Sequence, residues 1–211
     1  MPEGRIRLGA GLLAAAIVSG AIMGVGCGTR AMTLYEKVQR SKQYARTTES
    51  FTRTKEVHDG LDTRFIFSST WLSSEWIQAF SEEYANIYYL DAERREQEVG
   101  VWRRESELYE RFFVALFTPD DRMNDLDKKK TLWSLHLVRA DEVDFEPVYV
   151  RKTSLRPEEV SRFFPYADTF YRAYEIAFPK EAGEKVETPI ATSRFKLVLS
   201  GVQGRAVLVW D

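Results

Sequence analysis

The sequence is poor in the residues that bind metals and form disulfides. Its 211 residues include one cysteine, Cys27, and two histidines, His58 and His136. A single thiol excludes a disulfide within the chain, and a zinc site needs three or four ligands, usually Cys or His. We therefore expect no metal site and no cofactor. His136 lies in a segment with a strand pattern and His58 beside a turn, so both are interpreted as structural side chains.

The sequence also lacks an excess of positive charge. It has 30 Lys and Arg residues against 32 Asp and Glu residues. Removal of residues 1–26 leaves 28 basic and 31 acidic residues, a formal net charge of -3. Proteins that bind nucleic acids carry basic patches, so this composition argues against a nucleic-acid partner.

One long apolar run stands near the N-terminus. Arg5 and Arg7 precede residues 8–26, which contain no charged residue. A short basic head followed by an apolar segment that ends in small residues is the layout of a secretory signal peptide. The basic head stays with the cytoplasmic leaflet while the apolar segment enters the hydrocarbon. We expect residues 1–26 to be this signal peptide.

The end of the run resembles the lipobox of bacterial lipoproteins. Residues 24–26 (Gly-Val-Gly) are small, Cys27 follows them, and the chain then turns polar. Gly24 stands where the lipobox usually has Leu. The resemblance covers about the first tenth of the chain. It implies that Cys27 receives a diacylglycerol, that the signal peptide is cut before it, and that the new amino terminus is acylated.

The residue after the cysteine bears on the destination. In Gram-negative lipoproteins an aspartate there commonly retains the protein in the inner membrane, and this chain has Gly28. The resemblance thus implies a membrane partner, reached through acyl chains on Cys27, at the periplasmic face of the outer membrane. Several acyl chains hold a protein firmly, whereas one chain binds only marginally.

Two other interpretations of the run stay open. It is long enough to be an uncleaved membrane helix, since about 20 apolar residues span a bilayer. Its glycines argue against a stable helix, because each costs about 1 kcal/mol relative to alanine. In the second interpretation Cys27 is an ordinary buried thiol, although its segment belongs to no evident core.

The remainder of the chain is interpreted as a tether and one domain. Residues 27–46 are mostly polar, and we expect the lipidated cysteine and a tether with at most a short helix there. A single β-rich domain is expected over 47–211. Its first strands are predicted near 47–57 and 62–71, because Asp59-Gly60 between two β-prone runs is typical of a tight hairpin turn.

A helical block is predicted at about 73–109. Ser73 or Ser74 can cap its first helix, in which apolar residues recur at helical spacing. The second helix, after Asp91, is highly charged and is expected to be more exposed. The apolar stripe of the first helix comprises Trp76, Ile77, Phe80, Tyr84, Ile87 and Tyr88.

Short alternating runs dominate the rest of the sequence. Apolar and polar residues alternate in them, which is the pattern of half-buried antiparallel strands. Together with the first hairpin they give about eight strands. We therefore predict a mainly β fold, an antiparallel β-sandwich with an inserted α-helical hairpin. The runs are 111–118, 131–139, 147–152, 170–178, 194–200 and 205–211.

No catalytic motif stands out. The sequence has no G-x-S-x-G elbow, and Ser200 lies beside Gly201 in what a hairpin turn explains. The acidic segments 120–127 and 141–144 lack the EF-hand spacing. Successive loops of a meander lie at opposite ends of a sheet, so we interpret these segments as separate solvated loops rather than as a calcium site.

Pairs of carboxylates could in principle perform acid–base chemistry on sugars. Glu82 and Glu83, and Glu93 and Glu96, are such pairs within the helical block. We expect both pairs on outward helix faces, with arginines of the same helix as their partners.

The densest aromatic stretch is 162–179. One interpretation is an aromatic-lined groove for a peptide, a glycan or a lipid. The favoured alternative is a loop packed over one end of the sandwich, followed by a core strand whose inward residues begin with Phe170, because a β core needs such residues. The first candidates for a binding surface are Phe163, Phe164, Tyr166 and Trp76.

These features favour a lipid-anchored envelope protein that binds or scaffolds another envelope component and is not an enzyme. A periplasmic hydrolase acting on cell wall or lipid, and a carrier of a hydrophobic ligand, stay open as alternatives. A cleft that gathers acids around His58 or His136 would favour the hydrolase. Unbroken packing between the sheets would argue against the carrier.

Overall fold

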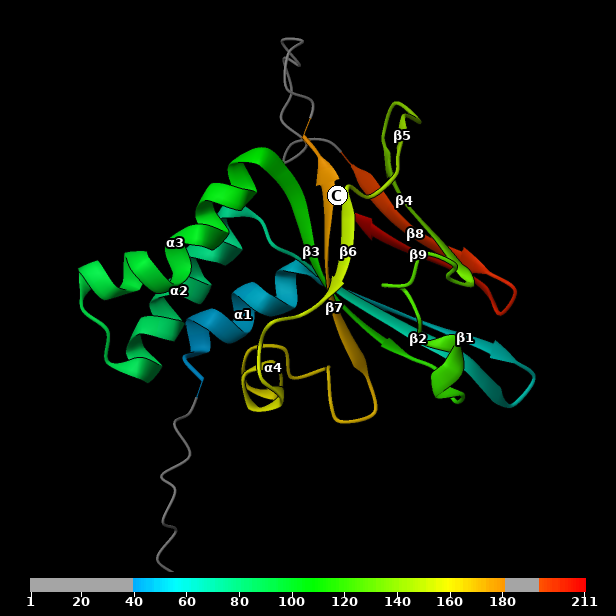
Figure 1. The fold of residues 1–211 in the computed structure, drawn as a ribbon, viewed down its shortest axis with the longest axis horizontal. Coiled ribbons are helices and arrows are strands. Elements are labelled where there is room, and N and C mark those ends of the chain that lie inside the picture. The colour runs from blue at the N-terminus through cyan, green and yellow to red at the C-terminus, as the bar shows by residue number, and fades with distance from the viewer. Residues whose placement is uncertain (1–39, 181–193) are drawn as a thin grey trace, which may run out of the picture. The chain divides into compact units, whose positions relative to one another are not determined.

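The structure is a computed structural model that describes residues 40–180 and 194–211. Four α-helices, one 3-10 turn and nine strands make up this described part (Figure 1). The elements are α1 (Lys42–Phe51), β1 (Thr52–Asp59), β2 (Asp62–Trp71), α2 (Ser74–Tyr88), α3 (Ala92–Leu108), β3 (Tyr109–Phe117), η1 (Asp121–Met123), β4 (Trp133–Arg139), β5 (Asp144–Phe145), β6 (Tyr149–Lys152), α4 (Pro157–Phe163), β7 (Arg172–Pro179), β8 (Phe195–Gly201) and β9 (Gly204–Trp210).

The strands form two antiparallel sheets, in agreement with the predicted mainly β fold. The first sheet has the order β1-β2-β3-β7-β6 and the second β5-β4-β8-β9. Side chains of both sheets share one buried cluster. Aromatic rings meet across it, with 4.8 Å between the ring centroids of Phe65 and Trp133 and 5.0 Å between those of Trp71 and Phe195.

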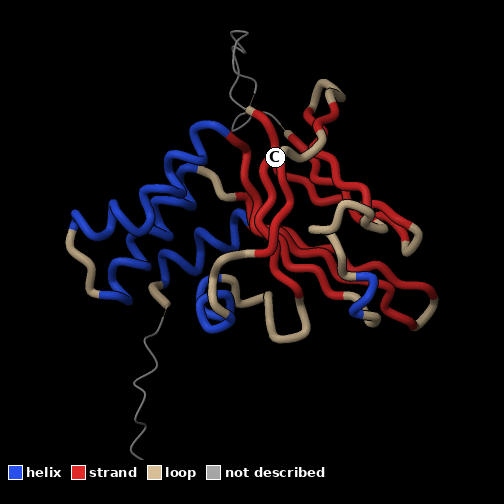
Figure 2. Tube along the Cα trace, viewed as in Figure 1, coloured by secondary structure: helices blue, strands red, loops and turns tan. Residues whose placement is uncertain are grey.

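Strand β3 is buried on both faces because the helices cover the other side of the first sheet. Successive side chains of a strand point to opposite faces. Phe112 and Val114 accordingly belong to the cluster shared by the sheets, whereas Phe113 and Ala115 belong to a second cluster with the helices. Figure 2 shows the α-helices gathered on one side of the strands.

Local signals explain how the chain enters and leaves several elements. The Ser73 side chain accepts a hydrogen bond from the backbone N–H of Trp76 and caps α2, as predicted. Pairing of β1 with β2 extends to Asp59 and Asp62, and Gly60 has a φ of 61° in the turn between them. This positive φ is what the Asp59-Gly60 sequence predicts.

Two strand predictions are wrong at their starts. Residues 42–51 form helix α1, so the strand predicted from residue 47 begins at Thr52 instead. Residues 42–46 belong to this helix, and a short helix was allowed for in the segment 27–46. Tyr44 and Thr48 are buried on one face of this helix, and such packing overrides the β preference of threonine. The strand predicted from residue 170 begins at Arg172, and Phe170 is 73% exposed rather than in the core.

Helix α4 and strand β5 are short elements that the sequence patterns did not predict. Helix α4 begins with Pro157, and the side chain of Glu159 accepts a hydrogen bond from the backbone N–H of Arg156 at 2.9 Å. Proline at the first position and an acid in the first turn are helix-start signals. Strand β5 has two residues, which are too few for an alternation of apolar and polar residues to predict a strand.

Cys27 and the segments predicted to be the signal peptide and most of the tether lie outside the described residues. Among residues 40–180 and 194–211, no helix has both the length and the apolar character needed to cross a membrane.

Candidate functional site

Three of the four residues predicted for a binding surface are core residues. Trp76, Phe163 and Phe164 are fully buried in the cluster between the helices and the first sheet. Phe164 stacks on Phe113 with 3.5 Å between ring centroids. This burial corrects the surface assignment of these three side chains and agrees with the packing alternative for the aromatic stretch.

Tyr166, the fourth, contributes to a surface pocket. The pocket has a volume of about 330 Å³, at the lower end of the range for small-ligand sites. It lies where α1 meets the start of β1 and the loop after α4, and we call it the α1 pocket. Its lining residues are Arg40, Ala45, Thr48, Glu49, Thr52, Pro165 and Tyr166.

A chain of hydroxyl groups holds the Tyr166 ring in the pocket wall. The Thr52 hydroxyl donates to the Thr48 carbonyl at 2.6 Å, so its oxygen accepts from Thr70 at 2.7 Å. The Thr70 hydroxyl in turn accepts from Tyr166 at 2.6 Å. Burial raises the pKa of the Tyr166 phenol, which keeps this donor protonated. A ligand in the pocket therefore meets a wall whose hydroxyl groups already donate hydrogen bonds within the protein.

The rim of the α1 pocket is charged. Arg40 and Glu49 line the pocket together with the ring of Tyr166. Opposite charges beside an apolar wall suit a ligand that has an apolar body and a charged or dipolar edge. An amino-acid side chain of a protein partner has this chemistry.

The carboxylate prediction is wrong for Glu83. Its side chain is buried, not outward, and accepts hydrogen bonds from Arg162 at 2.8 Å and from the backbone N–H of Ser41 at 3.2 Å. Glu83 therefore joins α2 to α4 and to the start of α1. Glu96 is exposed and pairs with Arg103 at 2.8 Å on its own helix, as predicted.

Two carboxylates of the acidic segment 120–127 pair with arginines of this chain. Arg122 binds Asp120 at 2.7 Å and holds the pKa of that carboxyl at about 2. Arg172 pairs with Asp121 at 3.1 Å. Within the described parts of the chain, no three His, Cys, Asp or Glu side chains are grouped so as to hold a metal ion.

The outer face of the second sheet carries a hydrogen-bonded chain of Ser134, His136 and Asp144. The Ser134 hydroxyl lies 2.6 Å from Nε2 of His136, and Nδ1 of His136 lies 2.9 Å from Oδ1 of Asp144. In the tautomer with the proton on Nδ1, His136 donates to Asp144 and accepts from Ser134. This is the order of groups that activates a serine nucleophile.

A second pocket adjoins the hydrogen-bonded side chains of His136 and Asp144. It has a volume of about 240 Å³, and we call it the His136 pocket. Ser134, Ser200 and Arg205 stand opposite one another on β4, β8 and β9. Arg205 therefore brings a positive charge to the same face. The residues lining the pocket are His136, Val138, Asp144, Val198, Ser200 and Arg205.

The sequence held only part of the signal for this cluster. Side chains two residues apart in a strand lie on one face, so the strand pattern of 131–139 places Ser134 and His136 together. Asp144 joins them because β5 pairs with β4, which places Asp144 opposite Val138. His58 has no such setting, because its ring contacts Glu56 and Thr63 at the exposed β1–β2 turn.

Comparison of the chain with protein-family models, with curated proteins and with solved structures finds no match.

Proposed function

We propose that the protein is a lipid-anchored envelope module, attached through Cys27, that binds another envelope protein at the α1 pocket. The observation that carries the proposal is the pocket itself, which combines the held Tyr166 ring with the charged rim of Arg40 and Glu49. Arg40 follows Cys27 by 13 residues. Arg40, a lining residue of the α1 pocket, is therefore close in sequence to the proposed anchor.

For the fold, we propose an antiparallel β-sandwich with a helical hairpin, α2 and α3, inserted between β2 and β3. Support comes from the aromatic contacts between the two sheets and from the chain order. The side chains shared by the sheets are almost entirely buried. Such packing argues against the alternative of a carrier with a hydrophobic ligand between its β layers.

Site-specific photocrosslinking in native envelopes tests the binding proposal. We expect p-benzoylphenylalanine in place of Glu49 to capture a specific envelope protein. The matched control has the same group in place of Leu61, an exposed residue at the β1–β2 turn. Repeated absence of a product specific to position 49 would contradict the proposal. An N-terminal peptide that begins at Met1 with unmodified Cys27 would contradict the lipid anchor.

A second candidate function is hydrolysis by acyl transfer, favoured by the Ser134–His136–Asp144 chain. Oγ of Ser134 would bond to the carbonyl carbon of an ester while its proton passes to Nε2 of His136. The bond to the leaving oxygen would then break, and that oxygen would take the proton. Water would hydrolyse the acyl–Ser134 ester in the same way. Arg205 is the group that would stabilise the negative charge.

If this second function operates, a fluorophosphonate probe should label Ser134, and Ser134→Ala should abolish the label. His136→Gln should slow labelling by about 10²-fold or more, because the general base is lost. Peptide mass analysis locates the adduct. Ser161→Ala, at an exposed serine of α4, is the control and should label normally. Failure of the native protein to form any adduct at Ser134 would rule out the hydrolase.

A further inference from the structure

The turn between α2 and α3 exposes an aromatic side chain on an unfavourable backbone. Tyr89 ends α2 with φ 52° and ψ 46° and is 92% exposed. Residues other than glycine occupy this left-handed region at a cost of about 1 kcal/mol. Glycine is the usual residue where a helix ends in this way. Neither packing nor backbone geometry therefore accounts for a tyrosine here, and strain of this kind is typical of functional positions.

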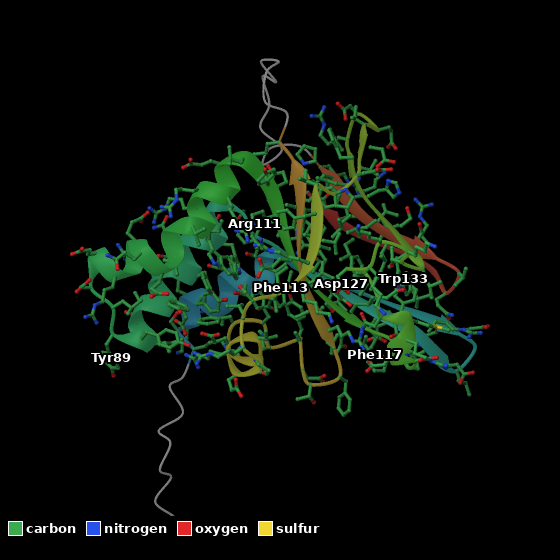
Figure 3. The ribbon with its side chains drawn as sticks, in the orientation of Figure 1. Tyr89, Arg111, Phe113, Phe117, Asp127 and Trp133 are labelled. Carbon is green, nitrogen blue, oxygen red and sulfur yellow. The ribbon has the colours of Figure 1, made fainter. Side chains whose placement is uncertain are left out.

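The Tyr89 turn lies at the same end of the helical layer as the start of helix α1. α1 ends where β1 begins and α2 begins just after β2, so the start of α1 and the end of α2 both point away from the strands (Figure 1). The backbone N–H of Ser41 contacts Glu83 at 3.2 Å. Tyr89 stands six residues further along α2, about 9 Å along its axis. Figure 3 shows Tyr89 at this outer tip.

The segment between Cys27 and Arg40 is long enough for this tip to reach a bilayer and short enough to keep the tip near it. Arg40 follows Cys27 by 13 residues, which span at most about 45 Å when fully extended. With Cys27 acylated, a tether of this length keeps Arg40, and with it the end of the domain that carries Tyr89, within about 45 Å of the lipid.

The chemistry of the tip fits a lipid interface rather than an anionic surface. Tyrosine is enriched at the boundary between hydrocarbon and water, where its ring is buried and its hydroxyl hydrated. Tyr88 beside it is also partly exposed. The charges of residues 86–95 cancel, since Asp91 and Glu93 oppose Arg94 and Arg95. Attraction to anionic lipids is therefore not required.

We propose that Tyr89 at the α2–α3 turn is a membrane-contact residue that inserts into the lipid headgroup region and orients the anchored domain. This inference rests on the proposed acylation of Cys27. One tyrosine contributes too little to anchor the protein by itself. Its role is to select one orientation of a domain that the acyl chains already hold at the surface.

Spin labelling of the mature protein, extracted from native membranes and placed in vesicles of phosphatidylcholine and phosphatidylethanolamine, tests the inference. With Cys27 acylated, an introduced cysteine is the sole free thiol. The probe is a nitroxide on Ala92→Cys, at an exposed position near Tyr89, and the control is a nitroxide on Leu61→Cys. We expect a water-soluble nickel chelate to collide less often with the probe at 92 than with the control.

The Tyr89→Gly variant separates membrane contact from structure. It is expected to abolish the protection at position 92, while relief of the left-handed tyrosine leaves the melting temperature unchanged or higher. Equal access at 92 and 61 with acylated Cys27 would overturn the inference and leave the anchor intact. Protection seen in native envelopes but not in protein-free vesicles would also overturn it, in favour of a protein partner. Unmodified Cys27, detected by mass, would overturn both proposals.

Discussion

Replacement of Glu175 by glutamine is expected to lower the free energy of unfolding by about 3 kcal/mol, because it removes one charge from a buried ionic cluster. Glu175 on β7 is almost fully buried and lies 2.8 Å from Arg151 of β6 and 3.4 Å from Arg111 of β3. Its other oxygen accepts a hydrogen bond from Thr153 at 2.9 Å. Glutamine keeps the shape of the side chain but leaves the buried positive charge of Arg111 with less negative charge beside it.

The cluster also attaches α3 to the first sheet. Arg111 pairs with Glu105 of α3 at 3.0 Å, and its guanidinium lies 5.0 Å from the ring centroid of Trp102 on the same helix. Arg111 lies between the helices and the strands in Figure 3. Loss of the Glu175 charge should therefore loosen the helical layer as well as the strand pairing.

Urea unfolding followed by circular dichroism measures the effect of Glu175→Gln. The matched control is Glu96→Gln, which removes an exposed carboxylate that pairs with Arg103 on the surface of α3. Exposed pairs contribute about 0 to 1 kcal/mol, so the control should change stability little. Equal, small effects of the two substitutions would mean that water reaches the Arg111 cluster.

The sequence predicted those parts of the fold that depend on local pattern. Alternation predicted the inward side chains of β4 and β8, and Asp59-Gly60 predicted the first turn. It could not predict that residues 42–51 are helical, because that helix depends on packing of Tyr44 and Thr48 against other elements. Local propensity is a weak guide where tertiary contacts decide.

The candidate sites show the same division. Both the α1 pocket and the Ser134–His136–Asp144 chain combine residues from separate elements, and neither could be recognised from spacing along one segment. Glu83 has the local sequence pattern of a surface residue. It is buried because its partners come from the start of α1 and from α4, which lie far from it in sequence. Burial of a charged side chain depends on partners that only the assembled fold provides.

Replacement of Trp76 by alanine is expected to lower the free energy of unfolding by about 3 to 5 kcal/mol, the range for buried Trp or Phe replaced by Ala. The Trp76 ring stacks on Phe80 and Phe164, with centroids 5.1 and 5.4 Å away. Its Nε1 donates to the Thr48 hydroxyl at 3.1 Å. Alanine would leave a large cavity between α2 and the first sheet and would remove this hydrogen bond.

Thermal and urea unfolding of Trp76→Ala distinguish the two interpretations of the aromatic residues. Phe170→Ala is the control, because that ring is 73% exposed and its loss should change stability by no more than about 0.5 kcal/mol. If Trp76 were a binding-surface residue, Trp76→Ala would leave unfolding unchanged and reduce only partner capture. A large loss of stability instead identifies Trp76 as a core residue that supports the α1 pocket through Thr48, one of its lining residues.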